Sequence, residues 1–106
     1  MTGPDTDDLE PGATETIETV DRPDRRRYEL LVDGHRAGFV RYALAGQRIT
    51  LIHTEMDPAH GGRGLGQRLA RDVLADARVR GLRVRPLCPF FARFIAAHPA
   101  YQDLVV

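Results

Sequence analysis

The sequence predicts an α+β or α/β fold, in which an antiparallel meander precedes a strand, glycine loop, helix and strand unit and a C-terminal helix. Three observations predict this fold. Two β-rich runs flank an Asp33-Gly34 pair, which is a strong hairpin signal. Four glycines within residues 61–66 directly precede an amphipathic run. Phenylalanines near the C-terminus recur at helical spacing.

Length and charge divide the chain into a tail and one domain. The chain has 106 residues, which suits a single domain. Residues 1–27 contain eight acidic and four basic side chains and few apolar ones, so we expect an acidic, mostly disordered N-terminal tail. Residues 28–106, the predicted folded domain, hold eleven Arg against seven Asp and Glu. The resulting mild positive charge suits an anionic ligand and does not indicate a nucleic-acid-binding protein.

Missing residue types exclude several kinds of chemistry. The sequence contains no Lys, Ser, Asn or Trp, so it cannot supply a serine nucleophile, a Schiff-base lysine or the lysine of a phosphate-binding P-loop. Cys88 is the single cysteine, which excludes an internal disulfide and a multi-cysteine zinc site, and we expect no metal. The chain has no membrane-length apolar run and no signal-peptide pattern, so we expect a cytoplasmic protein.

The meander is predicted from three runs of strand-forming residues, at 28–32, 36–44 and 48–56. The turns between them fall at residues 33–35 and 45–47. On the third strand, simple alternation places His53 on the same face as Ile49 and Leu51. We therefore expect His53 to emerge next to the apolar core.

A long helix is predicted at residues 64–80, where apolar side chains fall four apart at Leu65, Leu69, Val73 and Ala77. Gly81 follows at the position of a left-handed C-terminal cap, and residues 82–88 are a further strand. A helical crossover of this length makes that strand parallel to the third strand of the meander.

The last helix is predicted at residues 89–98, because Phe90, Phe91, Phe94 and Ile95 share one helical face. Pro89 suits the first helical position and Pro99 ends the helix. Residues 101–106 are either a short strand or a tail.

The glycine loop is the strongest functional signal. Free backbone N–H groups at a helix N-terminus bind anions, and a loop between a strand and a crossover helix lies where phosphate ligands bind. A flexible surface loop is the alternative. The dinucleotide pattern fails at Leu69, and the P-loop pattern fails at Gln67 and Arg68. The pattern (Arg/Gln)-x-x-Gly-x-(Gly/Ala) fits Gly64 and Gly66.

This last pattern is the coenzyme A signature of the GNAT acyltransferase superfamily. The segments LIHTEM, GRGLGQRLARDVLADARVRGLRVRPLCPF and HPAY resemble its compact single-domain acetyltransferases, over residues 28–106. The resemblance implies a shortened GNAT fold that lacks the two helices after the first strand of larger members. In one departure, Gly61 stands where Arg or Gln is usual, and Arg63 is a candidate to compensate.

The resemblance also implies acetyl-CoA as co-substrate and an amine acceptor, either a protein or a small molecule. The residues that we expect to contact the coenzyme lie at the end of the third strand, in the glycine loop and at the start of the last helix. They are Met56, Gly61, Gly62, Arg63, Gly64, Leu65, Gly66, Gln67, Arg68, Cys88 and Phe91.

Three side chains are candidates for the chemistry. Cys88 precedes the first helical residue Pro89, where a helix dipole favours a thiolate, so it either accepts the acyl group or only lines the thioester pocket. His53 is the first candidate for the general base, because histidine ordinarily titrates near neutral pH, and its alternative is packing at the edge of the core. Glu55 is the second candidate base, and its alternative is a solvated carboxylate.

Two functional hypotheses follow. The first is an acyl-CoA N-acyltransferase, which acts by direct attack of the amine or through a Cys88 thioester. The second is a non-catalytic module that binds coenzyme A or another anion and a protein partner. We expect no nucleic-acid or membrane partner, and a monomer or a homodimer.

Overall fold

The computed structural model of the protein describes residues 15–61 and 63–106. Within these residues one sheet of five strands has the order β1-β2-β3-β4-β5. The strands are β1 (Ile17–Arg22), β2 (Arg27–Val32), β3 (His35–Ala45), β4 (Arg48–Met56) and β5 (Arg83–Pro86), and the helices are α1 (Leu65–Val79) and α2 (Pro89–Ala97). The first four strands pair antiparallel, and β5 pairs parallel with β4. The predicted meander, crossover helix and parallel strand are confirmed.

The predicted β2–β3 turn is present and is one residue shorter than expected, because His35 already belongs to β3. Asp33 and Gly34 both have positive φ, at 51° and 81°. A hairpin turn of this kind needs two left-handed residues because its twist must match the twist of the strands. Glycine meets this requirement without steric cost, which explains why the Asp-Gly pair predicted the turn.

Strand β1 differs from the expectation of a disordered tail up to residue 27. Ile17–Arg22 pairs along its whole length with β2. The Ile17 side chain packs against the hydrophobic core. Polar contacts also join the strand to α1: the Thr19 hydroxyl donates to Asp72 at 2.7 Å, and the Ile17 carbonyl accepts from Arg68 at 3.1 Å. Composition and hydrophobic periodicity do not reveal contacts of this kind. The remainder of the predicted tail, residues 1–14, lies outside the described residues.

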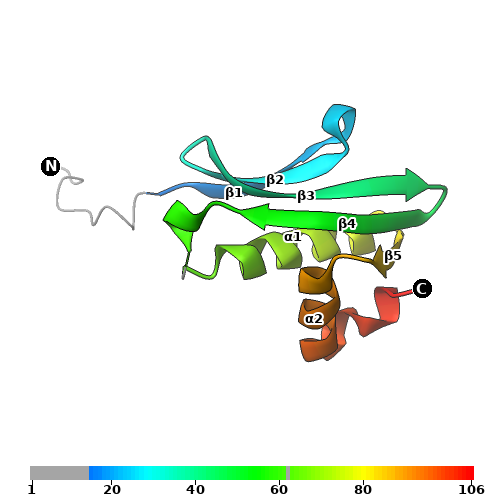
Figure 1. The fold of residues 1–106 in the computed structure, drawn as a ribbon. Coiled ribbons are helices and arrows are strands. Elements are labelled where there is room, and N and C mark those ends of the chain that lie inside the picture. The colour runs from blue at the N-terminus through cyan, green and yellow to red at the C-terminus, as the bar shows by residue number, and fades with distance from the viewer. Residues whose placement is uncertain (1–14, 62) are drawn as a thin grey trace, which may run out of the picture.

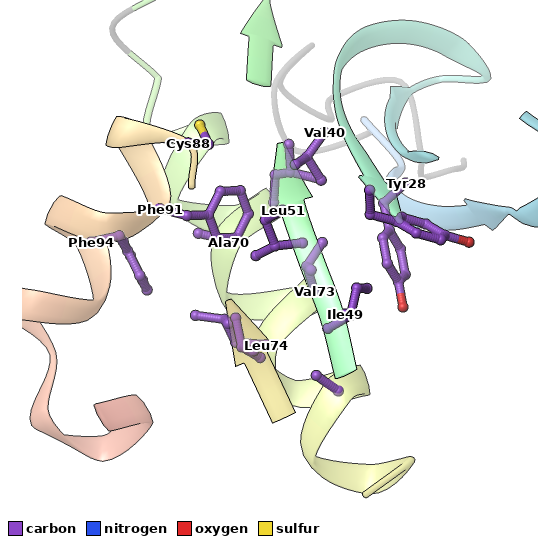
Figure 2. Close-up of a cluster of buried hydrophobic side chains, with 14 of the residues drawn as sticks. Tyr28, Val40, Ile49, Leu51, Ala70, Val73, Leu74, Cys88, Phe91 and Phe94 are labelled. Carbon is purple, nitrogen blue, oxygen red and sulfur yellow. The ribbon is translucent and has the colours of Figure 1, made fainter. Parts of the chain in front are cut away.

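Both helices pack on the same face of the sheet (Figure 1). Helix α1 buries the predicted stripe of Leu65, Leu69, Val73 and Ala77, widened by Ala70 and Leu74. Figure 2 shows Leu51 of β4 between side chains of α1 and Phe91 of α2. The core therefore lies in one layer between sheet and helices, and no element of the described chain covers the opposite face of the sheet, which we call the outer face.

Helix α2 begins at Pro89, with Cys88 as its N-cap residue, as predicted. Its buried side chains are Phe91, Phe94 and Ile95. A 3-10 helix (Pro99–Leu104) follows, and Val105 forms an isolated bridge with Val84 of β5. No helix in the described part of the chain is long and apolar enough to cross a membrane.

A β-bulge in β4 corrects the predicted orientation of His53. In the β3–β4 register Tyr42 faces Leu51 and Arg41 faces His53, so Ile52 is an extra residue on β4. A bulge of one residue reverses which face the following side chains occupy. His53 therefore points to the outer face and away from Ile49 and Leu51, and its side chain is 51% exposed. The expectation that these three share one face is wrong.

Candidate active site

Strands β4 and β5 separate at the point where their pairing ends. The last pair is Leu51 with Pro86, and beyond it the Leu51 carbonyl accepts from the amides of Leu87 at 3.0 Å and Cys88 at 2.9 Å. Strand β4 continues to Met56, and in the described part of the chain β3 is its only strand neighbour there. An open strand edge thus runs from Cys88 toward the glycine loop.

The main-chain groups on this edge can be assigned from the ladder. The Asp57 amide donates to the Ala37 carbonyl at 2.7 Å, so residue 57 faces β3. Because the main chain of successive strand residues points alternately to the two sides, Glu55 also faces β3, whereas Thr54 and Met56 face the open edge. Thr54 and Met56 therefore present donors and acceptors to a ligand lying along β4.

Cys88 lies where the two strands separate. Its side chain is buried at 4% exposure, and Sγ is 3.1 Å from Thr54 Oγ1, within hydrogen-bond distance for sulfur. This contact joins the inward face of β4 to the N-cap of α2. The structure thus brings Cys88 to the open edge, as the sequence predicted, and keeps it on the core side of the sheet.

The glycine loop leads directly into the N-terminus of α1. Gly64 is the N-cap residue, with φ 73°, and no side chain of the described residues caps this end. The first helical turn also carries no acidic residue. The free N–H groups of this 15-residue helix and its dipole therefore favour an anion at this end. Gly61, the first residue of the loop, follows a short 3-10 helix (Pro58–His60), and Gly62 lies outside the described residues.

Gly66 allows α1 and α2 to approach each other. A Cβ atom at Gly66 would lie 3.2 Å from the Phe90 ring and 3.8 Å from Met56. Phe90 is thus the phenylalanine that lies beside the loop. Phe91 and Leu65, which we expected to contact the coenzyme, are both buried in the core, and Phe91 is 0% exposed.

The two loop arginines already have partners. Arg63 forms an ion pair with Glu15, immediately before β1. Arg68 binds Asp72 at 2.9 Å, four residues along the helix. Among the other predicted coenzyme residues, Gln67 is exposed, and Met56 packs so closely on β3 that a Cβ at Gly38 would lie 2.3 Å from its sulfur.

His53 and Glu55 form a pair on the outer face. His53 Nε2 is 2.9 Å from Glu55 Oε2, and the His53 ring meets the Phe39 ring edge-on at 6.4 Å between centroids. An ionised carboxylate only accepts hydrogen bonds, so Nε2 donates to Glu55, and Nδ1 has no hydrogen-bond partner among residues 15–61 and 63–106. This arrangement fits a histidine base oriented by a carboxylate, and it lies on the opposite face from Cys88.

A cluster around Glu29 is the main feature that the sequence did not predict. Glu29 is the single buried charged residue among the described residues, at 4% exposure. Arg27 binds its carboxylate at 2.6 Å and Arg22 at 3.2 Å, and Arg25 and Arg36 each lie 3.9 Å away. Burial raises the pKa of Glu29, but the hydrogen bonds from Arg22 and Arg27 outweigh burial and lower it.

A second polar cluster fastens α1 to the sheet. Burial and hydrogen bonds to carboxylates raise the pKa of both Tyr28 and Tyr42. Tyr42 donates to Asp21 at 2.6 Å, and Tyr28 donates to Asp76. Arg80 also donates to the Tyr28 oxygen at 3.0 Å. These groups are mutually satisfied, so this cluster stabilises the packing of α1 on β1 and β2.

Comparison of sequences identifies relatives of the chain. The family described as GCN5-related N-acetyl-transferase matches residues 27–104. Protein NATD1 of Bos taurus is 32% identical over 82 residues, which are 76% of this chain and 73% of that protein. Protein NATD1 of Homo sapiens is 30% identical over 82 residues, with 76% and 73% covered.

Two solved structures share the fold. A GCN5-like protein from Staphylococcus aureus, solved by NMR, has a TM-score of 0.64 at 20% identity, over 86% of this chain and 87% of that chain. The ribosomal-protein-S18-alanine N-acetyltransferase of Escherichia coli has a TM-score of 0.54 at 18% identity, over 67% and 64%. These likenesses confirm the shortened GNAT fold expected from the resemblance.

Proposed function

The chain belongs to the GCN5-related N-acetyl-transferase family, and we propose that it transfers the acetyl group of acetyl-CoA to an amine acceptor. The observation that carries this proposal is the open edge of β4. It leads from Cys88 and Thr54, where the pairing with β5 ends, to the uncapped N-terminus of α1.

The pantetheine arm of the coenzyme is an extended chain with amide groups, so it can pair with a strand edge. The main-chain groups of Thr54 and Met56 can pair with its amides in the way that they would pair with a neighbouring strand. The pyrophosphate then lies at the N–H groups of Gly64–Gly66, where the dipole of α1 favours negative charge. Arg63 and Arg68 lie near enough to this end to exchange their carboxylate partners for phosphate.

His53 acts as the general base in this proposal. Its free Nδ1 takes the proton from the ammonium group of the acceptor, and the neutral amine attacks the thioester carbonyl. A C–N bond forms, the C–S bond breaks, and coenzyme A leaves as a thiolate. The attacking nitrogen loses its extra proton, and the thiolate takes up this proton. A main-chain N–H on the β4 edge stabilises the oxyanion that forms on the carbonyl oxygen. Glu55 keeps Nε2 protonated and holds the ring in place.

Cys88 lines the thioester pocket in this proposal and does not carry the acetyl group. Its side chain is buried, its sulfur contacts a neutral hydroxyl, and its candidate base His53 lies on the other face of the sheet. Cys88 does lie at a helix N-terminus, which favours a thiolate, but no base or cationic group lies next to it among the contacts of the described residues. Direct attack by the amine therefore fits the geometry better than a Cys88 thioester.

The experiment is a transfer assay with a panel of small amines and peptides, which follows the release of coenzyme A and the acetylated product by mass spectrometry. We expect product to form with at least one amine and to depend on His53. Selective binding of acetyl-CoA without turnover of any acceptor would contradict the proposal and favour a non-catalytic binding module.

A further inference from the structure

The outer face of the sheet contains a cavity of about 250 Å³ beside the His53–Glu55 pair. The side chains at its wall include Arg36, Phe39, Glu55 and Asp57, and the main chains of β3 and β4 complete it. Small-molecule sites commonly measure roughly 300–1,000 Å³. At about 250 Å³ this cavity lies just below that range, so its occupant must be a small ligand of few atoms.

One wall of the cavity carries positive charge that is only partly neutralised. The Glu29 carboxylate is already bound closely by Arg27 and Arg22, at 2.6 and 3.2 Å. Arg36 lies farther from it, at 3.9 Å, and its side chain is 48% exposed. A guanidinium group has five N–H donors in a planar fork, so Arg36 keeps donors for a second carboxylate.

The opposite wall carries negative charge next to the proposed base. Glu55 is 64% exposed and pairs across the strands with Phe39. The Phe39 ring lies 5.4 Å from the Arg36 guanidinium and 6.4 Å from the His53 ring. Asp57 is partly engaged, because its Oδ1 accepts from the Ala59 amide at 2.9 Å. A ligand with a cationic end and an anionic end matches these two walls.

We propose that this cavity binds the acceptor and that the acceptor is a small amine that also carries a carboxylate. The inference rests on the proposed acetyl transfer. Arg36 binds the carboxylate through its free N–H donors, and Phe39 packs against the carbon chain. The ammonium end lies at Glu55, next to His53, which takes its proton before attack.

Three amines of equal length test the proposal: 4-aminobutanoate, 4-aminobutanamide and 1,4-diaminobutane. They differ only in the negative, neutral or positive group at the far end. We expect kcat/KM for 4-aminobutanoate to exceed both others by about tenfold or more, because a charge-assisted hydrogen bond is lost in each of them.

Arg36→Gln should remove this preference by raising KM for 4-aminobutanoate alone. Arg25→Gln is the matched control, because Arg25 also lies 3.9 Å from Glu29 and is 61% exposed, but does not line the cavity. Equal rates with all three amines, or equal effects of the two substitutions, would overturn the proposal.

Binding without acetyl-CoA separates this inference from the proposed function. In a ¹H–¹⁵N titration of the full chain with 4-aminobutanoate, we expect shifts at Arg36, Phe39 and Glu55 that Arg36→Gln abolishes. If these shifts occur and no amine is acetylated, the transferase proposal fails and the binding site stands. If amines are acetylated and these residues do not shift, the cavity is not the acceptor site.

Discussion

Cys88 Sγ lies 3.1 Å from Thr54 Oγ1, across the point at which β4 and β5 stop pairing. The contact joins the N-cap of α2 to the inward face of β4. It also gives the thiol a hydrogen-bond partner in a site that is 4% exposed. This geometry is typical of a residue that lines a pocket.

Cys88→Ser should keep most of the activity, with kcat/KM within about fivefold of the original protein, because serine preserves a hydrogen-bonding group beside Thr54. Loss of a covalent nucleophile would instead lower the rate by roughly a thousandfold or more. Intact mass after incubation with acetyl-CoA is the second readout. The chain has no lysine, so a stable adduct that disappears in Cys88→Ala would identify an acetylated thiol and contradict the prediction.

His53→Gln should lower kcat/KM by roughly 10²–10⁴-fold, the usual contribution of a general base. His35→Gln, an exposed histidine at the start of β3, is the control. A kcat/KM of His53→Gln that equals that of His35→Gln would assign the base to another group.

Gly38→Ala should reduce the free energy of unfolding by about 2 kcal/mol, as overpacking in a core does. The added Cβ would lie 2.3 Å from Met56 Sδ and 2.8 Å from the Glu55 carbonyl oxygen. Adding Met56→Ala should not restore stability, because the main-chain contact remains. Gly61→Ala is the control, with φ −65° and its nearest neighbour at 3.2 Å. Urea unfolding checks all three, and equal stability of both single variants would contradict this packing.

Glu29→Gln should lower the free energy of unfolding at pH 7 by about 2 kcal/mol, because the arginines lose a buried anion. The folded pKa of Glu29 lies below its ordinary value of 4.5, so its contribution is complete above that pH and is lost as pH falls through the lowered value. The original protein should therefore lose more stability than the variant between about pH 5 and 2. The hydrogen bond from Arg78 also lowers the pKa of Asp103. Asp103 is present in both proteins, so it changes the pH dependence of their stability equally. Parallel slopes of stability against pH would contradict the assignment.

Regular patterns in the sequence were sufficient to predict most of the fold. The Asp33-Gly34 pair, the four-residue spacing in α1 and Pro89 at the start of α2 each reflect a local rule of backbone geometry or amphipathic packing. Strand β1 was missed because polar contacts, such as Thr19 with Asp72, hold it against α1.

The site was less predictable because it depends on two tertiary features. The bulge at Ile52 reverses the faces of the following residues, and alternation alone therefore placed His53 with Leu51. Glu29 lies in the run YELLV, where nothing local indicates that arginines from other segments surround it. Cys88 and the glycine loop were placed correctly relative to the strand ends, because a parallel crossover brings these ends to one edge.

A titration of the ¹⁵N-labelled full chain with acetyl-CoA tests the open β4 edge as the coenzyme site most directly. We expect saturable shifts of the Thr54 and Met56 amides together with those of Gly64–Gly66, whereas ATP, which has phosphates and no pantetheine, should leave Thr54 and Met56 unchanged. Unshifted Thr54 and Met56 amides at millimolar acetyl-CoA would show that the coenzyme does not bind along β4.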